Sequence, residues 1–250
     1  MDLRYIVLAF AVFVAQAVEA ITGFGGMITA ITLAAYVFDI EYIVPVLIPV
    51  NLVVSYYIVA RHWRHVQRRE LLTRLVPLAC IGFPVGIALF YVVQGPWLKI
   101  VYGAFVVVLS CFEIYASLRV RASKAPAPRP ISRLKGAALL ISGGLMQGLY
   151  CTGGPLFVIY TSRKIPDKWQ FRSTLSMLWV IVNTMILAGH SIGGAVNLDT
   201  MHTSLAVIPC MALGVAAGEY LHSRIDQQRF RLLVFCLLCF SGIYLVLSGL

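Results

Sequence analysis

Charged residues are scarce in this sequence, and their scarcity excludes a water-soluble fold. Only 12% of the 250 residues are charged, whereas 60% are hydrophobic. A soluble domain carries about 25% charged residues, because it needs them to cover its surface. A chain without that cover must bury its apolar surface in a bilayer. The sequence therefore predicts an integral membrane protein.

The motifs of hydrolases and of nucleotide-driven pumps are also missing. The chain has no H-E-x-x-H, no G-x-S-x-G and no nucleotide-binding loop. Its six cysteines lie inside apolar stretches, where small packing residues are more usual than metal ligands or redox pairs. We therefore expect no enzyme activity, no cofactor and no metal. Energy for any transport would have to come from an ion gradient, the membrane potential or a partner subunit.

What the sequence does have is eight long apolar blocks. Each block approaches or exceeds the roughly 20 residues that a helix needs to cross the hydrocarbon core. Such a series predicts a polytopic helical membrane protein. The blocks cover residues 5–38, 42–60, 71–93, 96–118, 136–160, 173–191, 201–221 and 231–250.

The net charge of +10 comes from basic residues in the short loops between these blocks. Lysine and arginine in such loops mark the cytoplasmic side and contact the anionic inner leaflet. No basic face with interleaved aromatic residues exists outside the blocks, so nucleic acid is not an expected partner. The expected partner is the lipid bilayer.

A polar, basic, proline-rich linker, residues 119–135, divides the chain into a first repeat, residues 1–118, and a second repeat, residues 136–250. At an offset of 132, Asn51 matches Asn183, and the chain has only three asparagines. This match favours an internal duplication within one integrated transport domain. Further matches at the same offset pair Pro77 with Pro209, Gly82 with Gly214 and Gly86 with Gly218, the glycines being expected to serve helix packing.

Each repeat also contains a glycine-rich run inside its first apolar block. Gln16 and the run T-G-F-G-G at 22–26 resemble Gln147 and the run C-T-G-G-P at 151–155, at an offset of 128 to 131 that requires a gap. Glycine and proline at these positions interrupt a helix. We expect the first segment of each repeat to be broken or re-entrant.

The positions of lysine and arginine favour an inverted second repeat. If all eight blocks cross, the basic residues of 163–172 and 224–231 lie outside. If the first block of each repeat is re-entrant, only Arg4 and Lys99 lie outside. The expected fold is therefore an all-α polytopic membrane protein of two repeats, each a broken first helix plus three crossing helices. Eight plain crossings remain the alternative.

The two helix breaks are the candidate substrate site. A half-helix that begins after a break directs unpaired N–H groups and the positive end of its dipole into the gap. Two such ends facing one pocket near the midplane would bind an anion; close helix packing is the other interpretation of the glycines. The candidate binding residues are Gln16, Thr22, Gly23, Gly25, Gly26, Asn51, Gln147, Thr152, Gly153, Gly154, Pro155, Arg172 and Asn183.

Glu19 is the acidic residue placed deepest in the first block, one turn before the first break. Charged groups inside a bilayer cost at least about 2.5 kcal/mol and are kept mainly for function. Glu19 is therefore the candidate carrier of a coupling proton. A neutral, hydrogen-bonded structural carboxyl is the competing interpretation.

With T-G-F-G-G, C-T-G-G-P, the basic loop after Tyr57 and R-S-T at 172–174, the chain resembles the TauE/SafE sulfite exporter family over nearly its whole length. The resemblance implies a duplicated permease that moves sulfite, sulfoacetate or related organosulfur anions across the bacterial inner membrane. Met27 stands where a third glycine is common in the family, and this departure concerns the substrate more than the fold.

These observations together predict a secondary transporter of small anions that works by alternating access. It would lie in the inner membrane as a multi-pass protein, with its basic loops and linker in the cytoplasm. The sequence leaves open whether a proton or a sodium ion couples transport and whether the chain forms a homodimer. The alternative function is a non-transporting membrane receptor or assembly subunit, although no large soluble domain is available to relay a signal.

Overall fold

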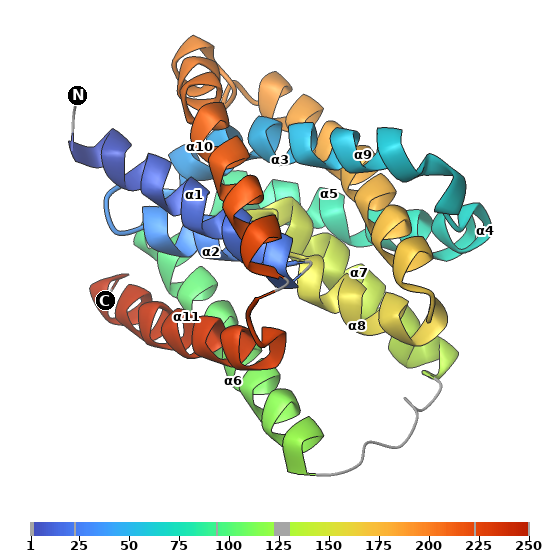
Figure 1. The fold of residues 1–250 in the computed structure, drawn as a ribbon. Helices are drawn as coiled ribbons and strands as arrows, with labels where there is room; N and C mark the ends of the chain where they lie inside the picture. Colours follow the sequence, from blue (N-terminus) through green and yellow to red (C-terminus); the bar gives the residue numbers. More distant parts are fainter. Residues whose placement is uncertain (1–2, 23, 94, 123–130, 223, 250) are drawn as a thin grey trace. The chain divides into compact units, whose positions relative to one another are not determined.

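The computed structural model describes residues 3–22, 24–93, 95–122, 131–222 and 224–249 (Figure 1). Every regular element in these ranges is helical. Within them, seven helical segments are long and apolar enough to cross a membrane. The prediction of an all-α polytopic membrane protein is therefore confirmed.

The first apolar block is two helices, as the glycine-rich run predicted. Helix α1 (Leu3–Thr22) ends just before the glycines, and α2 (Gly26–Ala34) begins within them. Gly25 has φ 90°, a left-handed conformation that glycine adopts without strain. The rest of this repeat consists of α3 (Ile40–His62), a 3₁₀ turn (Trp63–His65), α4 (Arg68–Glu70), a π-helical turn (Leu71–Leu75), α5 (Val76–Val92) and α6 (Pro96–Ala122).

The second repeat begins with a helix broken in the same way. Helix α7 (Arg133–Tyr150) is capped by the side chain of Ser132, and α8 (Gly154–Lys164) follows after three residues. Neither is among the seven segments that could cross alone, whereas α1 is. The remaining helices are α9 (Lys168–Ile192), which Asp167 caps, α10 (Leu198–His222) and α11 (Gln227–Gly249).

The chain folds into two compact units, and each unit draws on both repeats. Unit 1 comprises residues 1–43, 93–127 and 206–250, and unit 2 comprises residues 44–92 and 128–205. The boundaries predicted at 118 and 136 separate stretches of sequence rather than compact units. Part of the linker between them, residues 123–130, lies outside the described residues.

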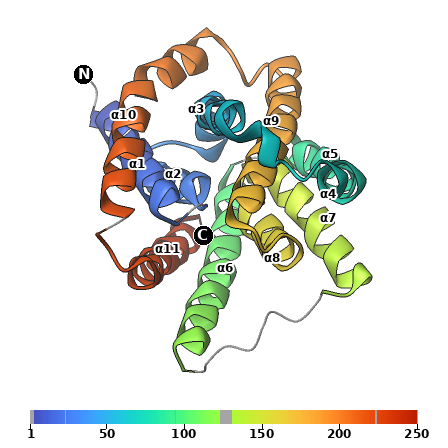
Figure 2. The ribbon, with the colours of Figure 1, turned by 45° about the vertical axis from the view of Figure 1, so that its right-hand side comes forward.

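In unit 2, α5 packs closely along α7 (Figure 2). A Cβ atom on Gly82 would overlap the backbone carbonyl of Ile141, and one on Gly86 would overlap the carbonyl of Leu145. Small residues let two helix backbones approach this closely, which is how membrane helices associate without a hydrophobic driving force. The prediction that these glycines serve packing is confirmed.

Unit 1 repeats this contact with α10 and α1. A Cβ atom on Gly214 would overlap the carbonyl of Phe13, and one on Gly218 would lie 2.6 Å from the carbonyl of Ala17. In each unit, therefore, two glycines of one repeat pack against the broken helix of the other repeat. An internal duplication predicts such paired contacts, although the duplication itself stays a prediction.

Accessibility labelling will test the inverted topology. In a variant lacking the six native cysteines, a cysteine at Asp167 should react only with a reagent applied from the cytoplasm, and one at Asn197 only from outside. Eight plain crossings predict the reverse for both positions. A membrane-impermeant maleimide applied to oriented vesicles is the measurement.

Candidate functional site

A side chain from the preceding helix holds the interruption between α7 and α8, residues 151–153, which we call break 2. Gln147 Oε1 accepts a hydrogen bond of 2.9 Å from the backbone N–H of Gly153. Cys151, just before, has φ 55° and so turns the chain out of the helix. Backbone groups at membrane depth must be satisfied inside the protein. Gln147 therefore satisfies the N–H of Gly153, a group that we had expected to bind the substrate.

The Gln147 amide is the start of a buried chain of three amides. Its Nε2 donates to Asn183 Oδ1 at 2.7 Å, and Asn183 Nδ2 donates to Asn51 Oδ1 at 2.9 Å. All three side chains are at most 6% exposed. The chain joins α7 to α9 and α3, and the two asparagines matched in the sequence are bonded to each other.

Thr152 brings a hydroxyl group into break 2. The side chain is 1% exposed, and its Oγ1 has no hydrogen-bond partner among the described residues. Beside the break, the Trp179 ring lies 3.9 Å from the position of a Cβ on Gly154. The Phe157 ring lies 5.5 Å from that indole, centroid to centroid. Break 2 therefore combines a buried hydroxyl, the start of a helix and an aromatic wall.

The interruption between α1 and α2, residues 23–25, is break 1. The carbonyl of Gly25 accepts hydrogen bonds from both N and Oγ1 of Thr29, at 3.0 and 2.9 Å. The carboxyl of Glu19 folds over the break and lies so close to Gly26 that a Cβ there would overlap it. A carboxylate at the first residue of α2 is favoured by the positive end of the helix dipole.

The two breaks share one register. Helix α1 ends and α2 begins 128 residues before α7 ends and α8 begins. In this register Glu19, not Gln16, corresponds to Gln147. The sequence comparison had aligned the two glutamines, which required a gap that the helix ends do not support.

Other predicted residues lie apart from these contacts. Gln16 is 4% exposed, and its Cβ packs 3.1 Å from the position of a Cβ on Gly214 of α10. Arg172 is exposed near the start of α9. Thr22 is the last residue of α1, and Gly23 lies outside the described residues. Gly154 and Pro155 begin α8, and Pro155 has no N–H to offer a ligand.

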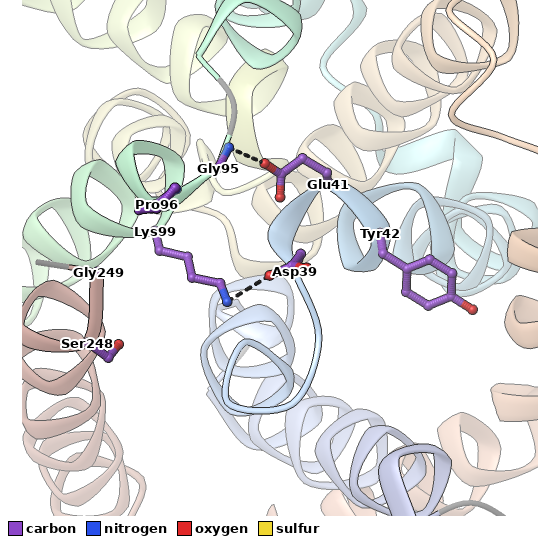
Figure 3. Close-up of a pocket in the computed structure, with 8 residues that line it drawn as sticks. All are labelled: Asp39, Glu41, Tyr42, Gly95, Pro96, Lys99, Ser248 and Gly249. Carbon is purple, nitrogen blue, oxygen red and sulfur yellow. Dashed lines mark hydrogen bonds and ion pairs between the residues drawn. The ribbon is translucent and has the colours of Figure 1, made fainter.

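A separate cavity of about 440 Å³ lies in unit 1, where the α2–α3 connection meets the start of α6 (Figure 3). Lys99 Nζ pairs with Asp39 Oδ1 at 2.8 Å, and Glu41 Oε1 accepts a hydrogen bond of 2.8 Å from the N–H of Gly95. Each of the two carboxylates thus has a partner within the unit. These contacts hold the α2–α3 connection against the start of α6, and they do not indicate a ligand site.

Comparison with known proteins supplies what the geometry does not. The family model described as "Sulfite exporter TauE/SafE" matches residues 8–245. The chain belongs to the sulfite exporter TauE/SafE family. It is also 26% identical over 105 residues to a protein of Comamonas testosteroni described as "Probable inner membrane transporter protein TsaS". That match covers 41% of this chain and 43% of the relative, and no solved structure matches the chain.

Membership of the TauE/SafE family agrees with the seven segments able to cross a membrane. The chain is a multi-pass membrane protein. The residues at the two breaks, however, are not assigned by the family match. Their roles depend on the contacts described above.

The left-handed residues at the breaks give a stability prediction for this TauE/SafE protein. Gly25→Ala should destabilise the fold by about 1–2 kcal/mol, because an L-residue at φ 90° is strained. Cys151→Gly should cost less than Gly25→Ala, because glycine removes the strain of the left-handed φ of 55° and so offsets part of the loss of the buried thiol. Thermal unfolding in detergent measures both. Equal losses in the two variants would contradict the left-handed backbone at these two positions.

Proposed function

We propose that the chain is a secondary transporter of small anions, with sulfite, sulfonates and related organosulfur compounds as its substrate class. Family membership supports transport of such compounds, and the helix breaks support an anion. The observation that carries the proposal is break 2, where the buried Thr152 hydroxyl adjoins the start of an 11-residue helix. Alternating access around the breaks would move the anion across the bilayer.

The chemistry of break 2 suits a compact oxyanion. The oxygens of a sulfite or sulfonate group accept hydrogen bonds from N–H and O–H donors, and its charge is favoured at a helix N-terminus. In a low-dielectric site these interactions are stronger than in water. No lysine or arginine lies in either break. The anion would then be held without a full positive charge, which helps it to leave again.

The remaining partners follow from the same proposal. A proton or sodium ion would couple transport to a gradient, and Glu19 is the acid placed to carry a proton. Exposed Arg172 would attract the anion before it enters. A homodimer is compatible with this scheme and is not required by it.

Reconstitution tests the function directly. The purified protein in proteoliposomes should take up sulfite or a short alkylsulfonate faster than empty vesicles do, and an imposed proton or sodium gradient should accelerate uptake. Uptake no faster than in empty vesicles, for every small oxyanion tried and under each gradient, would refute the proposal.

One substitution tests the role of break 2. Thr152→Val removes the hydroxyl but keeps the shape of the side chain, so it should weaken anion binding by about 1–2 kcal/mol, roughly tenfold, without loss of stability. Thr203→Val, in α10 and bonded to the carbonyl of Asp199, is the matched control and should leave uptake unchanged. If Thr152→Val transports like the wild type, the hydroxyl does not contact the substrate.

A further inference from the structure

One side chain reaches over each break, and the two side chains differ by one charge. Gln147 covers break 2 and Glu19 covers break 1, and each stands seven residues before the first residue of the following helix. Both contact a glycine at the break: Gln147 bonds the N–H of Gly153, and Glu19 lies against Gly26. Because the two side chains stand at the same position relative to their breaks, break 1 has an acidic side chain where break 2 has a neutral one.

At break 1 the chain places an acidic side chain of its own. The Glu19 carboxyl occupies the side of Gly26 where any other residue would place its Cβ. Gly26 begins a nine-residue helix, whose N-terminus carries partial positive charge. A substrate anion arriving there would meet the Glu19 carboxyl group already in place.

At break 2 the covering side chain is neutral, and both its oxygen and its nitrogen are hydrogen-bonded within the protein. Gln147 uses its oxygen for Gly153 and its NH₂ group for Asn183, and so adds no charge. The Thr152 hydroxyl, 1% exposed, has no partner among the described residues. This break therefore has a helix N-terminus and a buried donor with no anion of the chain in front of them.

We infer that the substrate oxyanion binds at break 2, and that the Glu19 carboxylate fills the place of an anion at break 1. The inference rests on the proposed function and gives the two breaks different roles. Binding specificity then depends on which of the two positions, 19 or 147, carries the carboxylate. Exchanging the two side chains should move the binding site from one break to the other.

The exchange is sterically feasible because glutamine and glutamate have the same shape. In Gln147→Glu, one carboxylate oxygen keeps the hydrogen bond from Gly153. The other needs a donor, which Asn183 provides if its amide turns over, and Asn51 can turn likewise to donate to Asn183 Oδ1. The buried amide chain is thus reversed rather than broken.

Trp179 reports on break 2, because its ring lies beside Gly154. The chain has four tryptophans, and replacing Trp63, Trp97 and Trp169 by phenylalanine leaves Trp179 alone. In this background, equilibrium binding of radioactive sulfite counts the sites, and Trp179 fluorescence shows whether break 2 is occupied. Glu113→Gln, which removes another buried carboxyl in unit 1, is the matched control.

The parent protein should bind one sulfite and change its Trp179 fluorescence. Glu19→Gln should bind a second sulfite that Trp179 does not detect. Gln147→Glu should weaken the fluorescence-detected binding at least tenfold. The double exchange should bind one sulfite with Trp179 silent, and Glu113→Gln should behave as the parent.

A single site in Glu19→Gln, or undiminished fluorescence-detected binding in Gln147→Glu, would overturn the inference while leaving anion transport intact. A parent protein that binds no sulfite and no methanesulfonate would overturn the proposed function, and the inference with it. Should Gln147→Glu not fold, the site count in Glu19→Gln decides alone.

Discussion

Gly82→Val should destabilise unit 2 far more than an aliphatic substitution at an exposed position of α5. The new side chain would have to occupy the space of the Ile141 carbonyl, and the backbone N of Leu145 lies 2.7 Å from the position of its Cβ. Overpacking usually costs about 1–3 kcal/mol, because neighbouring side chains can move aside. A backbone carbonyl inside α7 cannot move without displacing the helix. We therefore expect a loss above about 3 kcal/mol and a midpoint lowered by roughly 10 °C in detergent.

Two controls separate backbone contact from general sensitivity of α5. Ala88→Val introduces the same side chain at an exposed position of this helix and should leave the midpoint unchanged. Truncating the nearby side chain, in Gly82→Val with Leu145→Ala, should not restore stability, because the obstacle is backbone. Recovery in the double variant would show that a side chain, and not the α7 backbone, limits the approach.

The helices and their breaks could be predicted because the bilayer imposes simple requirements. A crossing helix needs a long apolar run, and a Gly-Gly-Pro sequence inside such a run cannot continue a helix. Both rules act locally, so the sequence reveals them. The correspondence of Asn51 and Asn183 between the repeats was also visible, since asparagine is rare in this chain. Their hydrogen bond to each other was not predicted.

The packing partners could not be predicted in the same way. The spacing of Gly82 and Gly86 indicates that α5 packs closely against some helix, but it does not say which one. That the partner is α7, from the other repeat, depends on the surfaces of both helices. The compact units consequently differ from the two repeats.

The side chains that cover the breaks were missed for a different reason. A glutamine that bonds a backbone N–H six residues later leaves no pattern in the sequence. The shared glutamines at 16 and 147 suggested a correspondence by identity. The helix ends place Glu19 there instead, since α1 and α7 both end four residues before the first residue of the following helix. Identity of one residue was a weaker guide than the spacing of the break.

Asn183→Leu should be the most damaging substitution in the amide chain. Leucine fills the same volume but leaves Gln147 Nε2 and Asn51 Oδ1 without partners, in side chains at most 6% exposed. Interhelical hydrogen bonds in membranes average only about 0.6 kcal/mol, because the freed group often finds another partner. Here the side chains are buried, so a freed group has little chance of finding another partner. Each polar group left without a hydrogen bond costs about 1–3 kcal/mol. We expect a loss of about 2–6 kcal/mol and no transport, since Gln147 would no longer be fixed over break 2.

A double-mutant cycle with Asn51→Leu distinguishes stranded polar groups from poor packing. The two single variants together strand three polar groups, whereas Asn51→Leu/Asn183→Leu strands only Gln147 Nε2. The double variant should therefore be less damaged than the sum of the single ones, by about 2–6 kcal/mol. Thermal unfolding of the four proteins in one detergent supplies the numbers. Additive losses would mean that the two asparagines act independently and that their bond does not fix the amide chain. Coupling without recovery of transport would show that break 2 needs Asn183 itself, because only its Oδ1 can hold the Gln147 amide in place.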